Sequence, residues 1–154
     1  MRNFGEADKK KKQSRIQIPE NPENLPQEML SQLENMVKTS LRDGNLQCAT
    51  AFKIARQAHV PNIAVGEVTD RLGIRITNCR IGCFKVDKIV HDNLDQKKIG
   101  DEIIPLLESI GKTNELTCAK VFDLALHLKL TPMAIADVAN LYNLKIHRCQ
   151  FGCF

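Results

Sequence analysis

A chain of 154 residues with a formal net charge of +4 holds one domain or two small ones. No apolar run approaches the ~20 residues of a membrane-spanning helix, and no apolar stretch follows the charged first residues, so neither a membrane-spanning helix nor a secretory signal is expected. These features predict a cytoplasmic protein, whose six cysteines are thiols or metal ligands rather than disulfides.

The unit of structure is set by an internal repeat. Residues 46–84 and 116–154 align at an offset of 70 without a gap, and twelve of the thirty-nine aligned positions are identical. Most other apolar positions exchange one hydrophobic residue for another. The chain is therefore expected to fold as two similar modules that pack together or dimerise, since each is near the lower size limit for an independent core.

Residues 1–25 are expected to form a disordered basic tail. Lys9–Lys12 form a run of positive charge, and Pro19 and Pro22 interrupt any helix. We interpret this stretch first as a solvated arm; the alternative is an arm that contacts phosphates.

An amphipathic helix is expected ahead of each repeat. Over 26–42, apolar residues recur at steps of three and four, and Pro26 suits the first helical turn. Residues 97–110 show the same pattern, although Pro105 should kink or split that helix. The predicted division is a tail (1–25), a first helical repeat (26–84), a linker (85–96) and a second helical repeat (97–154).

Within each repeat, the pattern predicts two helices and a third short segment. The helices are expected at 48–58 and 62–72 in the first copy, and at 118–128 and 132–142 in the second. Gly73 and its counterpart Asn143 tolerate the left-handed conformation that ends a helix. The third segments, 75–82 and 145–152, are predicted to be helical. The alternative is a strand or hairpin, because the β-branched residues Ile74, Ile76 and Ile81 fall there.

The end of each repeat resembles the helix-turn-helix pattern of DNA-binding proteins. In that pattern a small residue on the first helix faces its partner, a glycine opens the turn, an apolar residue follows, and the second helix carries an apolar anchor. The matching positions are Thr69, Gly73, Ile74 and Cys79 in the first copy, and Ala139, Asn143, Leu144 and Cys149 in the second. The pattern can also be placed one helix earlier, on Ala55, Val60 and Val65, but His59 then stands where glycine is usual, so the later placement is preferred.

This resemblance implies an all-α fold of two tandem tri-helical modules, and a DNA-binding transcription regulator that inserts the third helix into the major groove of double-stranded DNA. The residues expected to contact DNA are Arg75, Thr77, Asn78 and Arg80 in the first copy, and Lys145, His147, Arg148 and Gln150 in the second. Arginine suits guanine edges or phosphate, and asparagine and glutamine suit adenine. The two copies share more of their inward-facing residues than of these exposed residues.

The cysteines follow the spacing Cys-x30-Cys-x3-Cys in each copy. Three thiols are one short of a structural zinc site, and the histidines do not repeat, so zinc or an iron–sulfur cluster would need ligands from both copies. We favour packing for most of them, with no cofactor. The candidates for a metal or redox role are Cys79, Cys83, Cys149 and Cys153.

No sequence motif points to an enzyme. Phosphate-binding glycine loops, zinc-protease motifs and nucleophile elbows are all missing from the sequence. Two alternatives to DNA binding stay open: a protein–protein interaction or adaptor module on the same scaffold, and a metal or redox sensor built on the cysteines. A homodimer fits either binding function.

Overall fold

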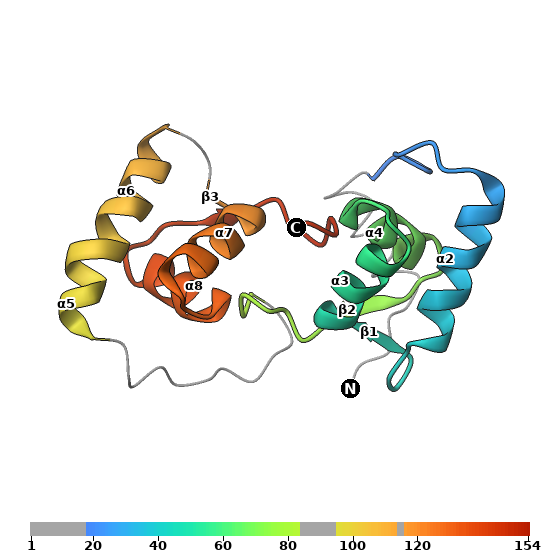
Figure 1. Ribbon diagram of the computed structural model, residues 1–154, viewed down its shortest axis with the longest axis horizontal. Helices are drawn as coiled ribbons and strands as arrows, with labels where there is room; N and C mark the ends of the chain where they lie inside the picture. The colour runs from blue at the N-terminus through green and yellow to red at the C-terminus, as the bar shows by residue number, and fades with distance from the viewer. Residues whose placement is uncertain (1–17, 84–94, 114–115) are drawn as a thin grey trace. The chain divides into compact units, whose positions relative to one another are not determined.

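A computed structural model describes residues 18–83, 95–113 and 116–154, and shows a mainly helical chain with two small parallel sheets (Figure 1). Residues 1–17 of the tail predicted over 1–25, and residues 85–94 of the linker predicted over 85–96, lie outside these ranges.

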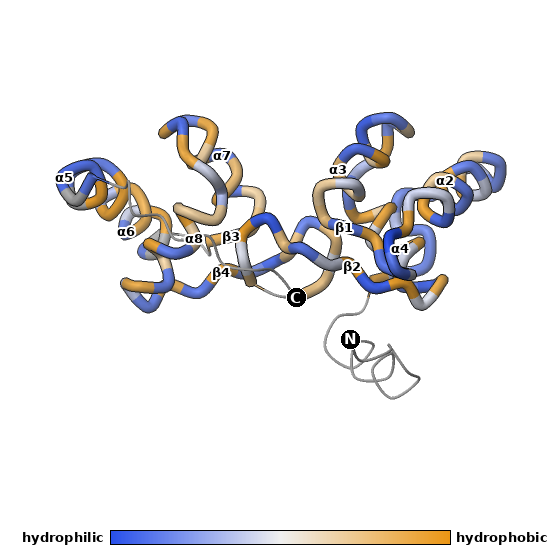
Figure 2. The backbone as a smooth tube through the Cα atoms, turned by 90° about the horizontal axis from the view of Figure 1, so that it is seen from below, coloured by the Kyte–Doolittle hydropathy of each residue, from blue (hydrophilic) through white to orange (hydrophobic). Residues whose placement is uncertain are grey.

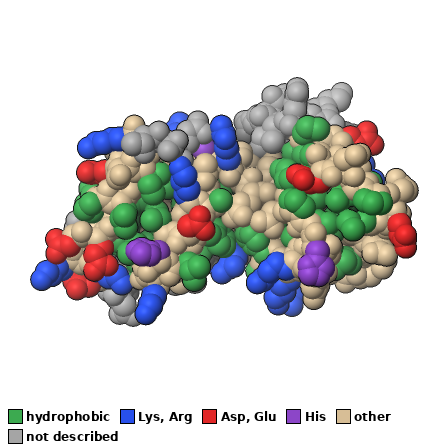
Figure 3. Space-filling view, turned by 45° about the horizontal axis from the view of Figure 1, so that its top comes forward, with side chains coloured by type: hydrophobic (Ala, Val, Ile, Leu, Met, Phe, Trp, Pro, Cys, Tyr) green, Lys and Arg blue, Asp and Glu red, His purple; other side chains and the backbone are tan. Residues whose placement is uncertain are grey.

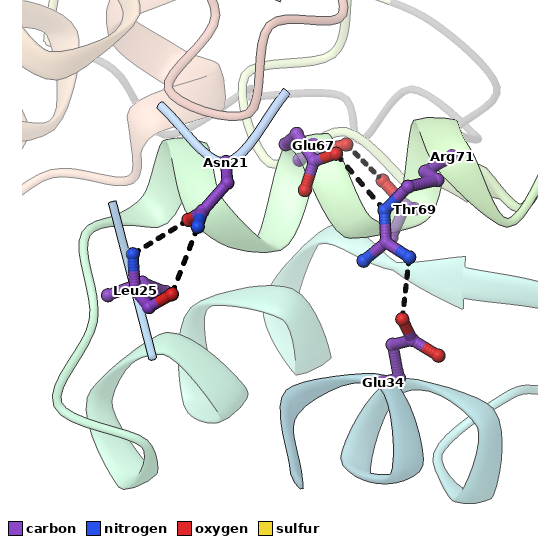
Figure 4. Close-up of polar contacts among 7 residues, drawn as sticks. Asn21, Leu25, Glu34, Glu67, Thr69 and Arg71 are labelled. Atoms are coloured by element: carbon purple, nitrogen blue, oxygen red, sulfur yellow. Dashed lines mark hydrogen bonds and ion pairs between the residues drawn. The ribbon is translucent and has the colours of Figure 1, made fainter. Parts of the chain in front are cut away.

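The first repeat is preceded by helix α2, Gln27–Thr39, close to the predicted 26–42. Leu30, Leu33 and Val37 recur at steps of three and four and are buried against α3 and α4. The apolar stripe alternates with hydrophilic residues along the helix, which Figure 2 shows as a change of colour from turn to turn. Ahead of the helix, the Asn21 side chain accepts a hydrogen bond from the Leu25 N–H at 2.8 Å and closes the preceding turn (Figure 4).

The repeats have the same order of elements. The first contains strand β1 (Asn45–Gln47), helices α3 (Cys48–Gln57) and α4 (Asn62–Arg71), and strand β2 (Arg75–Thr77). The second contains β3 (Leu116–Thr117), α7 (Cys118–Leu128), α8 (Pro132–Leu141) and β4 (Ile146–His147). The four predicted helices of the repeats are therefore confirmed to within one residue at each end.

The prediction of a third helix in each repeat is wrong, and the strand alternative is correct. Arg75–Thr77 pairs in parallel with Asn45–Gln47, which places Leu46 beside Ile76 in the core. Leu116 pairs with Ile146 in the second sheet. β-Branched side chains pack well on a pleated surface, and a positive φ at Asn78 ends any regular helix there. The fold is consequently not purely α-helical.

The preferred placement of the helix-turn-helix pattern is wrong for the same reason. The earlier placement, on Ala55, Val60 and Val65, coincides with α3, its turn and α4. His59 takes φ +53° at the position where glycine is usual, and the Val60 N–H bonds to the Ala55 carbonyl at 3.0 Å. This six-residue closure, with a left-handed residue inside it, is the Schellman ending of a helix.

The left-handed residues that end the second helices occur where the sequence predicts them. Gly73 has φ +69° and Asn143 has φ +57°. The Ile74 N–H bonds to the Thr69 carbonyl at 2.8 Å, and the Leu144 N–H to the Ala139 carbonyl at 2.9 Å. Each turn thereby satisfies carbonyls that the end of a helix leaves without a partner.

Pro105 has the predicted effect on the helix ahead of the second repeat. That helix consists of α5 (Gln96–Lys98), a π-helical turn η1 (Ile99–Ile103) and α6 (Ile104–Thr113). Proline has no N–H to give to the carbonyl four residues back, and the preceding turn is widened. The Ile104 N–H accordingly bonds to the Ile99 carbonyl, five residues back.

The compact units do not follow the sequence repeats. The first unit contains the residues up to Cys79 together with Gln150–Phe154, and the second contains Arg80–Cys149. The last residues of the second repeat, Gln150–Phe154, are therefore part of the first unit. We call them the closing segment.

Candidate functional site

The residues predicted to read DNA in the first copy lie on a strand and the turn after it. Arg75 is half-buried and Thr77 is buried, both in β2. Asn78 is exposed with φ +52°. The exposed Arg80 has its guanidinium carbon 5.1 Å from the ring centre of Phe122, a cation–π contact within the second unit. None of them projects from a helix.

The second copy places its predicted residues similarly. Lys145, His147 and Arg148 are exposed around β4, and Arg148 has φ +50°. Gln150 belongs to the closing segment, and its side-chain oxygen accepts a hydrogen bond from Asn62 Nδ2 at 2.9 Å. The structure therefore keeps three of these four side chains at the surface and uses the fourth within the first unit.

The six cysteines differ in exposure. Cys48, Cys79 and Cys118 are buried, Cys149 and Cys153 are half-buried, and Cys83 is exposed. Within residues 18–83, 95–113 and 116–154, no three Cys, His, Asp or Glu side chains lie together as a metal site would require.

The sequence did not predict that the closing segment packs on α3 and α4. Phe151 is 1% exposed, and its ring meets that of Phe52 edge to face, with centroids 4.7 Å apart and planes at 67°. We call the surface formed by Phe52, Asn62, Ile63 and Gly66 the segment site.

Two glycines bring the backbones into contact there. A Cβ atom built on Gly66 of α4 would overlap the carbonyl oxygen of Phe151, and would lie 2.7 Å from its carbonyl carbon and 2.9 Å from its Cα. Gly152 has φ +69°, and a Cβ there would lie 2.5 Å from Ile18 Cδ1 and 3.3 Å from Ile63 Cδ1. Glycine is therefore needed at position 66 because backbone atoms fill the space, and at position 152 because of its positive φ.

The hydrogen bond between Asn62 and Gln150 adds a polar contact at the edge of the segment site. It joins residues 88 positions apart and is partly buried. Together these contacts hold one large apolar side chain, one main-chain stretch and one side-chain amide.

An ion-pair group ties α2 to α4 away from the segment site. Arg71 Nη1 contacts Glu34 Oε1 at 2.6 Å and Arg71 Nε contacts Glu67 Oε1 at 3.2 Å (Figure 4). Lys38 Nζ is 3.6 Å from the other Glu34 oxygen. The hydrogen bond from Arg71 lowers the pKa of Glu34 below its ordinary value of 4.5, and the same bond raises the pKa of Arg71. Glu67, itself buried, is held by that guanidinium.

Two arginines of the first repeat are replaced by exposed leucines in the second. Position 141, which corresponds to Arg71, is Leu141 and is 76% exposed; position 126, which corresponds to Arg56, is Leu126 and is 82% exposed. Figure 3 shows hydrophobic side chains at the surface on the face that it draws. Single exposed leucines are common on protein surfaces and do not by themselves define a site.

The sequence contains a signal for the segment site that motif reasoning missed. Cys83/Cys153 and Phe84/Phe154 are among the identical pairs of the repeat, yet they follow its last predicted element, which ends at Gly82 and Gly152. Residues kept beyond the last element indicate that this tail packs on something. The identity of that surface, in the first unit, could not be read from the repeat.

No family model, curated protein or solved structure matches this chain. Across the ranges that the structure describes, no helix has the length and apolar character to cross a membrane.

Proposed function

We propose that this chain is a protein–protein interaction module and that its segment site binds a short peptide segment. The observation that carries this proposal is the main-chain contact at Gly66, where an α-helix leaves room for the backbone of Phe151. Close approach of two backbones requires a matched surface over several residues. Phe151 supplies the buried aromatic anchor that is typical of peptide recognition.

The burial of α4 supports this function over insertion of a helix into DNA. Six consecutive residues of α4, from Ala64 to Thr69, are buried. In α8 the buried set is similar, from Met133 to Ala136 and again at Val138 and Ala139. A recognition helix must offer one face to the groove, and these second helices are surrounded.

The proposal is tested by opening the segment site in the full chain and adding the segment back. Phe151→Ala removes the anchor, and a synthetic peptide with the sequence of residues 148–154 then has an empty site to enter. We expect saturable binding by fluorescence anisotropy and a rise in Tm, since a ligand at a hundredfold excess over Kd stabilises by about 2.7 kcal/mol.

The matched control is the same peptide with alanine in place of the phenylalanine that corresponds to Phe151, and this peptide should not bind. Circular dichroism establishes that the variant is folded. If Phe151→Ala does not fold, Gln150→Ala is used in its place, because it weakens the packing of the closing segment less. Absence of binding to a folded variant would overturn the proposal.

A DNA-binding transcription regulator is the second candidate, and one observation favours it. Lys145, His147 and Arg148 are exposed close together, and no Asp or Glu occurs from Leu144 to Phe154. Such a patch suits phosphate contacts. Binding to a random duplex that weakens steeply with salt supports this function; undetectable binding at 50 mM salt removes it.

A further inference from the structure

The closing segment fills the first unit but is attached to the second. Gln150–Phe154 belongs to the first unit, whereas its covalent neighbour Cys149 belongs to the second. The contacts of Phe151 and Gln150 with α3 and α4 would be the same whichever molecule supplied the segment. The peptide bond between Cys149 and Gln150 is what makes the chain itself the source of the segment.

The second unit cannot accept the closing segment in the same pose. Positions 62 and 66 of the segment site correspond to Pro132 and Ala136. Pro132 has no side-chain donor for the Gln150 amide, and the Cβ of Ala136 occupies the space that Gly66 leaves open. The closing segment is thereby specific for the first unit.

We propose that the segment site of one chain accepts the closing segment of a second copy, so that the protein dimerises by exchanging Gln150–Phe154. This inference rests on the proposed function, since it requires the segment site to bind a segment that is not tethered to it. Each copy has one segment site and one closing segment. Two copies can therefore fill both sites in a dimer with two-fold symmetry.

Concentration decides between the two arrangements. A tethered segment acts at an effective concentration in the millimolar range for a short flexible connection, so the closed monomer predominates in dilute solution. The dimer gains population as the protein concentration rises, or when the intramolecular contact is blocked.

Two full-length variants with complementary defects test the exchange. Gly66→Ala blocks the segment site and leaves the closing segment intact; Phe151→Ala disables the segment and leaves the site intact. Each variant alone should sediment as a monomer of about one chain mass, 17.3 kDa. Mixing them should produce a one-to-one complex of twice that mass, with a Kd within about tenfold of that of the 148–154 peptide.

The matched control is a mixture in which both chains carry Gly66→Ala, and it should remain monomeric. Peptide binding to Phe151→Ala without a complex in the mixture would refute the exchange and leave the peptide site standing. Failure of the peptide to bind as well would refute both. If Phe151→Ala does not fold, Gln150→Ala takes its place in the mixture.

Discussion

Replacing Gly66 by alanine gives a test in which two physical effects have opposite signs. Gly66 lies inside α4, where glycine costs about 0.5–1 kcal/mol relative to alanine because of backbone entropy. On propensity alone, the variant should be more stable by that amount. The contact with Phe151 predicts the reverse, since the added methyl group would meet backbone atoms that cannot rotate away.

The size of the effect follows from the overlap. Inserting a methyl group into a packed contact costs about 1–3 kcal/mol, because the neighbouring atoms must move. If the closing segment leaves instead, the chain loses the burial of Phe151, about 1.5–3 kcal/mol, and regains the entropy of the released residues. Set against the propensity gain of about 0.5–1 kcal/mol, the overlap predicts a variant that is less stable than the parent by up to about 2.5 kcal/mol.

Urea unfolding followed by circular dichroism measures this difference, because the midpoint shifts while the slope stays constant. The matched control is Ala136→Gly at the equivalent position of the second unit, which should cost about 0.5–1 kcal/mol from propensity. A Gly66→Ala variant that is more stable than the parent would refute the packing of the closing segment on α4.

Three further outcomes are expected. Ala55→Leu should destabilise by about 1–3 kcal/mol in urea unfolding, because Ala55 is buried between α3 and its neighbours; an unchanged midpoint would contradict that packing. The lowered pKa of Glu34 should make the chain lose stability as pH falls below about 4.5, because the Glu34 charge is complete only above the pKa of the unfolded chain. Arg71→Met should flatten that part of the plot of stability against pH, and an unchanged slope would argue against the ion pair. If the second candidate function holds, Lys145→Ala with Arg148→Ala should reduce the salt dependence of duplex binding, which a filter or anisotropy titration at several salt concentrations measures.

The helices and their endings were predictable because their signals are local. A stripe of apolar residues at steps of three and four defined α3 and α7, and left-handed residues at Gly73 and Asn143 ended the helices that follow. The interruption of the α-helix ahead of Pro105 follows from the chemistry of a single residue.

The strands and the segment site required information that short windows do not contain. Arg75–Thr77 is three residues long, too short for a period of two to be told from a helical turn. Its conformation is fixed by pairing with Asn45–Gln47, thirty positions earlier. The contact between Asn62 and Gln150 spans 88 positions and crosses from one repeat to the other, so similarity between the repeats could not locate it.

The order of the units along the chain has a consequence for synthesis. Every residue of the second unit is translated before the last residues of the first, since Arg80–Cys149 separates Cys79 from the closing segment. On a ribosome, the earlier half must therefore wait, with Phe52 and Gly66 uncovered, for about seventy more residues to be added at roughly 5–20 per second. During those seconds a neighbouring finished chain is the nearest source of the missing piece, and crowded translation should favour intertwined products over single molecules.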